Sequence, residues 1–362
     1  MSKETKKPHE KLGRDTRDPN NTIVSHEGLP KISILLPVYN AEDSLDSSLR
    51  SIQRQSVVDW ECIIVNDGST DSSPAIAQSY AKQDSRFRLL DSSHIGLVAA
   101  LNLGIGKCRG SFVARMDADD LMHSSRLEKQ LKEMMDNPRL DAVACYIRLF
   151  PRTSLGSGLR EYEKWLNSMS DAGSIRTDAF IECPVAHPSL FIKAKVLKAF
   201  EYRDKGWPED YDLILRLLQN DKEISIVPER LLSWRNGPAR MSMNHPSYSI
   251  EQFTNCKAQF LSQGFLHKHA TYILWGYGKT GKALAKALAK LGHRPSYIIE
   301  LHPGRLGNRI MGALVIPPEE LAKLDKKQPV VVSVARPKPR SDVRAALKQM
   351  KFQEQHDYIC AA

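Results

Sequence analysis

The sequence predicts an α/β protein with a mixed, mainly parallel sheet in its larger part and a second, smaller α/β unit behind it. Short apolar, β-rich runs alternate with helical segments from residue 31 onward, a rhythm typical of parallel sheets with right-handed crossovers. A second series of this kind begins at residue 271. At 362 residues, the chain exceeds the size at which one core usually stops growing. We therefore expect a flexible extension over 1–29, a first domain over 30–264 and a second over 265–362.

Local patterns predict the elements of the first domain. Runs rich in β-branched and aromatic residues between turn residues indicate strands, and apolar residues at helical spacing indicate helices. The expected strands are 32–36, 60–65, 87–90, 111–115 and 140–147, and the expected helices are 44–54, 73–81, 98–105, 124–135, 213–218 and 247–263, the last capped by Gly264. The glycine-bearing segment up to residue 186 predicts irregular loops, where specificity is often built.

The second domain repeats the alternation on a smaller scale. Its expected strands are 271–275, 297–300, 330–334 and 358–360, and its expected helices follow the first strand up to 291 and then cover 318–324 and 342–350. These elements form βαβ units and predict a Rossmann-like sheet.

Composition excludes several classes of protein. The six cysteines are scattered without a C-x-x-C pair, so neither a zinc site nor a disulfide framework is indicated. No signal-peptide pattern or membrane-length apolar run occurs, which predicts a cytoplasmic protein. Despite the net charge of +10, no basic stripe with interleaved aromatics occurs before residue 250, so we expect no nucleic-acid partner. The basic surface suits weak association with the anionic inner membrane face, and a homodimer is left open.

Three short acidic motifs follow apolar runs or open a helix. They are Asn66-Asp67-Gly68-Ser69, Asp117-Ala118-Asp119-Asp120 and Glu209-Asp210-Tyr211-Asp212. The carboxyl edge of an α/β sheet is where ligands bind, and an Asp-x-Asp pair can hold Mg²⁺ or Mn²⁺ through hard oxygen ligands. Each motif also has a plain structural interpretation, as a solvated turn, an Asx turn or a helix-stabilising acidic first turn.

In this order, the motifs resemble those of the family 2 glycosyltransferases with the GT-A fold. The resemblance covers residues 31–245 and rests on Pro37-Val38-Tyr39-Asn40, Val65-Asn66-Asp67-Gly68-Ser69-Thr70-Asp71, Gly96 with Ala100-Leu101-Asn102, Met116-Asp117-Ala118-Asp119-Asp120 and Glu209-Asp210-Tyr211-Asp212-Leu213. It implies metal-dependent, inverting transfer of a sugar from a nucleotide-sugar donor, with UDP expected, to the hydroxyl of a glycan, lipid-linked or small-molecule acceptor. It also implies a part in cell-surface polysaccharide biosynthesis.

The resemblance carries over to single positions. It implies uracil recognition by Asp67, a metal ligand at Asp119, a donor-facing Asp117 that also counts as a candidate ligand, and a general base at Asp210 with Glu209 as orienting group or second choice. Further donor contacts are expected at Pro37, Tyr39, Asn40, Gly96, Asn102, His187, Arg235 and Arg240, and His245 is a candidate third metal ligand. His94 departs from the family, which more often has Asn there. His187 could equally be a satisfied core histidine, and an exposed arginine is often merely solvated.

A glycine loop marks the second domain. Gly276-x-Gly278-x-x-Gly281 follows a predicted strand, and Glu300 lies nineteen residues later, which matches the dinucleotide fingerprint. A P-loop is excluded because Ala283 stands where a hydroxyl would bind Mg²⁺. The segment resembles the small Rossmann-like domains appended to some sugar-modifying methyltransferases and acyltransferases. Two interpretations stay open: a nucleotide-type site with Lys279 beside the phosphate and Glu300 on a ribose, or a packing turn without a ligand.

Two rival functions come from other classes. An NAD-dependent oxidoreductase led by the glycine loop is disfavoured, because the second domain has no obvious catalytic acid, base or substrate half. A non-catalytic nucleotide-sensing or scaffold protein is disfavoured by the intact Asp119 and Asp210.

Overall fold

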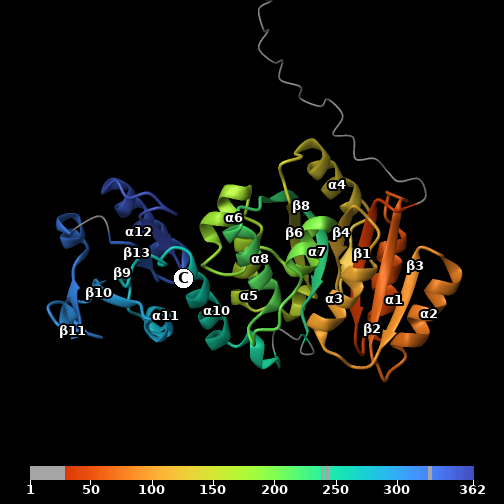
Figure 1. The fold of residues 1–362 in the computed structure, drawn as a ribbon, viewed down its shortest axis with the longest axis horizontal. Helices are drawn as coiled ribbons and strands as arrows, with labels where there is room; N and C mark the ends of the chain where they lie inside the picture. The colour runs from red at the N-terminus through yellow and green to blue at the C-terminus, as the bar shows by residue number, and fades with distance from the viewer. Residues whose placement is uncertain (1–28, 238–239, 241–243, 325–327) are drawn as a thin grey trace, which may run out of the picture.

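The computed structural model describes residues 29–237, 240, 244–324 and 328–362, so the extension predicted over 1–29 lies outside the described residues apart from Leu29. Two sheets lie one after the other along the long axis of the molecule, and helix α10 (Ile250–Gln263) lies between them (Figure 1). The first sheet has eight strands and the second has six.

The first sheet is mixed and mainly parallel, as predicted. Its spatial order is β3-β2-β1-β4-β7-β6-β8-β5. The strands are β1 (Ile32–Val38), β2 (Trp60–Asp67), β3 (Phe87–Ser92), β4 (Phe112–Arg115), β5 (Leu121–Met122), β6 (Ala142–Phe150), β7 (Phe191–Lys193) and β8 (Ile224–Arg235). Only β7 and β5 run antiparallel to their neighbours. Strands β5 and β8 were not predicted from the sequence; β5, with two residues, is too short to show a period.

Helices cover both faces of this sheet. They are α1 (Leu45–Gln53), α2 (Ser73–Gln83), α3 (Leu97–Lys107), α4 (Arg126–Asp136), α5 (Ser157–Leu166), α6 (Ala172–Asp178), α7 (Ala194–Phe200) and α8 (Glu209–Gln219). Alternate residues of β1 point to opposite faces: Ile34 and Leu36 join the core under α1, whereas Leu35 joins the core under α3. Both faces are therefore apolar, which explains the continuous apolar runs of the central strands.

One segment differs clearly from its prediction. The region expected to form irregular loops contains the helices α5 and α6. Gly156 is the N-cap of α5, and Gly173 lies in the first turn of α6, so these glycines mark helix starts rather than loops. Helix α8 also begins at Glu209, four residues before the predicted start, and this places the third acidic motif in its first turn.

The second sheet has the order β11-β12-β10-β9-β13-β14. Its strands are β9 (Thr271–Trp275), β10 (Arg294–Ile299), β11 (Arg309–Ile310), β12 (Ala313–Ile316), β13 (Val330–Val332) and β14 (Tyr358–Cys360), and its helices are α11 (Lys279–Lys290) and α12 (Pro337–Gln349). All pairings are parallel except that of β11 with β12. The helix predicted over 318–324 is a 3-10 helix, Pro318–Lys323.

Helix α10 contributes to the cores of both parts. Cys256 and Phe260 belong to a core of the first sheet, whereas Ala258 and Leu261 pack with the second. The buried Lys257 ammonium donates to the carbonyls of Ile181 and Ala361 at 2.9 and 3.1 Å. The two sheets are therefore joined by apolar packing and by a buried cation. Among the residues described, no helix is both long and apolar enough to cross a membrane.

Candidate active site

The shared direction of the central parallel strands brings the first two acidic motifs to one edge of the first sheet. Val38 pairs with Asn66 between β1 and β2, and Leu35 pairs with Arg115 between β1 and β4. The turn after β2 and the loop after β4 therefore both leave from the carboxyl edge, the ligand edge of α/β sheets.

The carboxylate of Asp67 organises the loop before α3. It is buried and accepts hydrogen bonds from the backbone N–H groups of Ile95 and Gly96 at 2.7 and 3.0 Å. The ring of His94 lies 3.0 Å from the same carboxylate and stacks on Tyr39 with ring centroids 4.2 Å apart. Asp67 therefore holds His94 against Tyr39, whose side chain is exposed. Gly96 has φ = 86°, a backbone conformation that favours glycine.

Asn40 connects the end of β1 with the turn after β2. Its side-chain oxygen accepts from the N–H of Thr70 at 2.8 Å, and its own N–H donates to the hydroxyl of Ser69 at 3.0 Å. It therefore shapes the turn that follows Asp67.

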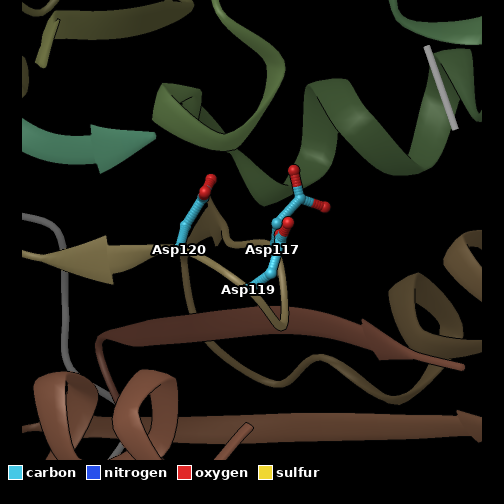
Figure 2. A group of neighbouring side chains, drawn as sticks. All are labelled: Asp117, Asp119 and Asp120. Carbon is cyan, nitrogen blue, oxygen red and sulfur yellow. The ribbon is translucent and has the colours of Figure 1, made fainter. Parts of the chain in front are cut away.

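Three aspartates gather on the loop between β4 and β5. Asp117, Asp119 and Asp120 each offer a carboxylate oxygen, and these oxygens all lie within 4.8 Å of one another (Figure 2). His245 was also a candidate ligand, but it lies outside this cluster and accepts instead from the N–H of Ser247 at 3.4 Å. Asp120, which the sequence analysis did not select, completes the group.

The charges of this cluster are only partly balanced. Burial and then the neighbouring Asp117 raise the pKa of Asp119 to about 6. Burial, followed by Asp117 and Asp119, raises the pKa of Asp120 well above its usual range. Asp120 is fully buried, and its Oδ2 has no hydrogen-bond partner among the described residues. A buried carboxylate oxygen without a donor is costly, so the cluster is suited to a cation.

Arg235 supports the aspartate loop from β8. Its N–H donates to Asp120 Oδ1 and its Nε donates to the carbonyl of Asp119, both at 2.7 Å. Its guanidinium also lies over the ring of Phe150. Arg240, the other arginine predicted here, lies over the ring of Trp234, 4.2 Å from its centroid. Its charge offsets part of the rise in the pKa of Asp119 that burial and Asp117 cause. Both arginines therefore act on the aspartate loop.

Arg115 is a functional candidate that sequence reasoning missed. It ends β4, is 4 % exposed and forms an ion pair with Asp117. Burial lowers the pKa of its guanidinium, but the charges of Asp117, Tyr202 and Glu209 raise it overall, so it stays protonated. Arg115 thus links the aspartate cluster to the first turn of α8. The sequence feature that could have indicated Arg115 is a charged residue at the end of an otherwise apolar strand.

The first two of the three acids in the first turn of α8 differ in their hydrogen bonds. Both oxygens of the buried Glu209 accept from the hydroxyl of Tyr248, at 2.8 and 2.7 Å, and burial raises the pKa of Glu209. Burial and then Glu209 raise the pKa of Asp210 to about 7. Asp210 Oδ1 accepts from the N–H of Tyr211 at 2.7 Å, and no hydrogen bond to its other oxygen occurs among the described residues. Asp210 therefore has one oxygen available for a substrate.

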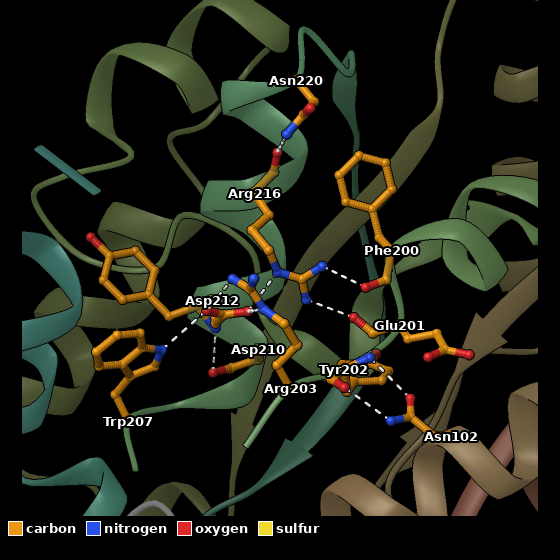
Figure 3. Close-up of polar contacts among 11 residues, drawn as sticks. Asn102, Phe200, Glu201, Tyr202, Arg203, Trp207, Asp210, Asp212, Arg216 and Asn220 are labelled. Atoms are coloured by element: carbon orange, nitrogen blue, oxygen red, sulfur yellow. Dashed lines mark hydrogen bonds and ion pairs between the residues drawn. The ribbon is translucent and has the colours of Figure 1, made fainter. Parts of the chain in front are cut away.

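Asp212, the third acid of this turn, is fully occupied. It is completely buried and accepts from Arg203, Arg216 and Trp207 at 2.9, 2.6 and 3.1 Å (Figure 3). These contacts neutralise Asp212 and fix the start of α8, so it supports the site without facing a substrate.

Three predicted donor contacts are engaged elsewhere. Pro37 is buried inside β1. Both polar atoms of the Asn102 amide bind the backbone of Tyr202 at 2.9 Å (Figure 3). His187 is buried, lies 2.7 Å from the Tyr202 hydroxyl and 3.7 Å from Glu209, and burial followed by Arg115 keeps its pKa well below the usual range. The contacts of His187 are those of a core histidine whose polar atoms have partners. Asn102 and His187 both hold Tyr202 in place.

Comparison with known proteins decides the family. Residues 33–197 match the model of glycosyl transferase family 2. An uncharacterized glycosyltransferase of Methanocaldococcus jannaschii is 30% identical over 217 residues, which cover 59% of this chain and 73% of that protein. The chain belongs to glycosyltransferase family 2. The resemblance found in the sequence is thereby confirmed, and the protein is a glycosyltransferase enzyme.

Other relatives of this glycosyltransferase agree. A putative glycosyltransferase of Bacillus subtilis, EpsE, is 28% identical over 228 residues, covering 61% of this chain and 79% of that protein. Residues 1–349 of S. aureus TarS, solved in complex with UDP, superpose with a TM-score of 0.50 at 16% identity, covering 71% of this chain and 70% of TarS. This likeness shows a shared fold. The matched segment covers a smaller share of other relatives, namely 59% of one Haemophilus influenzae protein and 34% of B. subtilis EpsJ.

Proposed function

We propose that this enzyme transfers a sugar from a UDP-sugar to an acceptor hydroxyl with inversion at the anomeric carbon. The acceptor is a glycan, a lipid-linked sugar or a small molecule. One observation carries the proposal: Asp210 has a free oxygen and a pKa of about 7, and the charge of Arg115, which forms an ion pair with Asp117 of the aspartate cluster, also acts on Asp210.

The donor base is assigned to the surface beside Tyr39. The Tyr39–His94 stack offers an aromatic face at the carboxyl edge, and aromatic faces bind nucleobases by stacking. Asp67 fixes this face by holding His94 and the following two N–H groups. We keep Asp67 as the residue that recognises uracil, because a carboxylate oxygen can accept more than one hydrogen bond.

The aspartate cluster is assigned to a divalent cation. Its oxygen donors, the raised pKa of Asp119 and the unpartnered oxygen of Asp120 all fit a hard ion such as Mg²⁺ or Mn²⁺. Asp119 would be the direct ligand, because Asp117 is engaged by Arg115 and Asp120 keeps only its unpartnered Oδ2 for the ion. When bound, such an ion neutralises the diphosphate that leaves. Asp117 is assigned to the donor ribose or sugar.

The proton transfer is assigned to Asp210. In an inverting transfer, the acceptor hydroxyl attacks the anomeric carbon opposite the diphosphate, and one carboxylate takes its proton. A pKa near 7 leaves a large ionised fraction at neutral pH and makes the carboxylate a stronger base than an ordinary aspartate. Glu209 is less available, since Tyr248 occupies both of its oxygens. Burial is the main cause of the raised pKa of Asp210, and the charge of Glu209 adds to it.

Calorimetry with UDP tests the proposal. UDP should bind with Mn²⁺ present and bind much more weakly with EDTA, and Asp119→Asn should remove the metal-dependent part. Asp136→Asn is the control, because Asp136 is an exposed acid that pairs with Lys132 on α4. Equal UDP affinity with Mn²⁺ and with EDTA would exclude the cation. A UDP-binding protein that releases no UDP from any UDP-sugar, with or without acceptors, would favour the non-catalytic alternative.

A further inference from the structure

A second ligand edge lies in the C-terminal sheet, apart from the glycosyltransferase site. Trp275 at the end of β9 pairs with Ile299 of β10 on one side and with Val332 of β13 on the other, all in parallel. The chain after β9 goes to β10, whereas β13 lies on the opposite side of β9, so the strand order reverses between β9 and β13. Such a switch point opens a crevice at the carboxyl ends of the strands.

Two long helices begin at this crevice, one on each face. Helix α11, of 12 residues, follows β9, and α12, of 13 residues, follows β13. Helix α11 packs on the face of β9 that carries Leu274, and α12 packs on the face that carries Ile273. The first turn of α11 therefore points its unpaired N–H groups toward this edge, which favours an anion. In α12, Pro337 and Pro339 have no N–H, and Arg340 donates to the carbonyl of Arg336, so its first turn offers the N–H of Lys338 alone.

The three glycines of the loop after β9 have different explanations. A Cβ on Gly281 would lie 2.1 Å from the carbonyl oxygen of Gly276, and a Cβ on Gly276 would lie 2.9 Å from that of Ser333. Close packing thus explains these two glycines. A Cβ on Gly278 would have no heavy atom within 4 Å, and its φ of −73° suits any residue. Packing does not account for Gly278, which leaves open space above the start of α11.

Ser333 provides an independent observation. It follows β13, is 4 % exposed, and its hydroxyl has no partner among the described residues. Its Cβ lies 3.4 Å from the position that a Cβ on Gly281 would take, so the Ser333 side chain lies beside the first turn of α11. A buried hydroxyl without a partner is rare in a folded protein. The Ser333 hydroxyl is therefore a buried donor without a partner next to the glycine loop.

Charged groups complete the edge. Lys279 begins α11 and Arg336 immediately precedes α12; both are exposed, and neither has an ion-pair partner within the described part of the chain. Glu300 follows β10, and its Oε1 accepts from the N–H of Tyr277 at 2.8 Å and from Arg305 at 3.0 Å. No hydrogen bond to Glu300 Oε2 is found among the described residues, so this oxygen can accept from a hydroxyl.

We propose that the crevice between β9 and β13 binds a phosphate-bearing nucleotide. The phosphate lies over Gly278 at the starts of α11 and α12, with Lys279, Arg336 and the Ser333 hydroxyl as donors, and Glu300 Oε2 accepts from the ribose. This site does not depend on the function proposed for the first sheet.

Calorimetry on the full chain, with ADP, NAD⁺, UDP and inorganic pyrophosphate as probes, tests the site. At least one nucleotide should bind, more tightly than pyrophosphate. Gly278→Val should weaken that binding by about tenfold or more, because the side chain fills the phosphate space, and Arg336→Ala should weaken it similarly by removing a charged donor. If UDP is the ligand, it should show two binding events, of which Gly278→Val removes one.

Two variants are matched controls. Gly156 is also an N-cap glycine with ordinary φ and no heavy atom within 4 Å of a Cβ, so Gly156→Val should leave binding unchanged. Lys286→Ala removes an exposed cation farther along α11. Equal thermal unfolding of all variants shows that they fold. The proposal is overturned if no nucleotide binds to the folded chain, if Gly278→Val and Arg336→Ala bind like the controls, or if pyrophosphate binds as tightly as the nucleotides.

Discussion

The hydroxyl of Tyr248 lies 2.8 and 2.7 Å from the two carboxylate oxygens of Glu209. It is the donor that occupies this buried acid, and it comes from the segment just before α10, far along the chain from α8. The contact distinguishes the first two acids of the motif, because Glu209 is occupied while Asp210 retains a free oxygen.

Tyr248→Phe removes this donor. Leaving the buried Glu209 carboxylate without it should lower the free energy of unfolding by about 1 to 3 kcal/mol. The Tyr248 hydrogen bond lowers the pKa of Glu209, so the pKa of Glu209 should also rise in the variant. Chemical denaturation measures the first effect. Tyr80→Phe is the control, since the Tyr80 hydroxyl binds Asp46 on the α1 surface; equal losses of unfolding free energy in both variants would contradict this prediction.

Asp210→Asn should abolish transfer while donor binding persists. The substitution removes the proton acceptor and keeps the size of the side chain, and a general base contributes about 10² to 10⁴-fold in rate. Release of UDP from the UDP-sugar in the presence of acceptor measures the rate, and calorimetry measures donor binding. A variant that retains more than about a tenth of the native rate would show that another group is the base, with Glu209 the next to test.

The rate should depend on pH through Asp210. Its pKa is raised to about 7, chiefly by burial and then by Glu209. The base acts only as a carboxylate, so kcat/KM should fall as the pH falls through about 7 and level off above it. A pH profile that stays flat down to the usual range of aspartate pKa values would disprove this assignment.

Asp212→Asn should destabilise the fold rather than alter the chemistry. It leaves Arg216, 10% exposed, and Arg203 without their shared carboxylate, and breaking a buried ion pair typically costs about 3 to 5 kcal/mol. Thermal and chemical unfolding measure the loss. Asp46→Asn, which breaks an exposed pair with Arg50, should change stability little. If both variants unfold alike, the contacts of Figure 3 do not anchor α8.

Much of the site was readable from the sequence because its residues are adjacent in the chain. The motifs at Asp67, Asp119 and Asp210 each follow a strand or open a helix, and strand direction alone sends the first two to one edge. The alternation of apolar runs and helices likewise predicted the mainly parallel sheet. Glycine positions misled the prediction at α5 and α6, because a glycine can cap a helix as well as interrupt one.

Only the tertiary structure decided which side chains are free to act. Asn102 and His187 have residue types that suit ligand binding, yet both hold Tyr202, which lies elsewhere in the chain. Arg115 became a candidate only when its burial beside Asp117 was known. The role of Glu209 depends on Tyr248, which is distant in the chain. The role of Gly278 depends on the open space beside it. A local sequence pattern gives the types of residues and their order along the chain. Burial, hydrogen-bond partners and open space depend on segments that are distant in the chain and meet only in the folded structure.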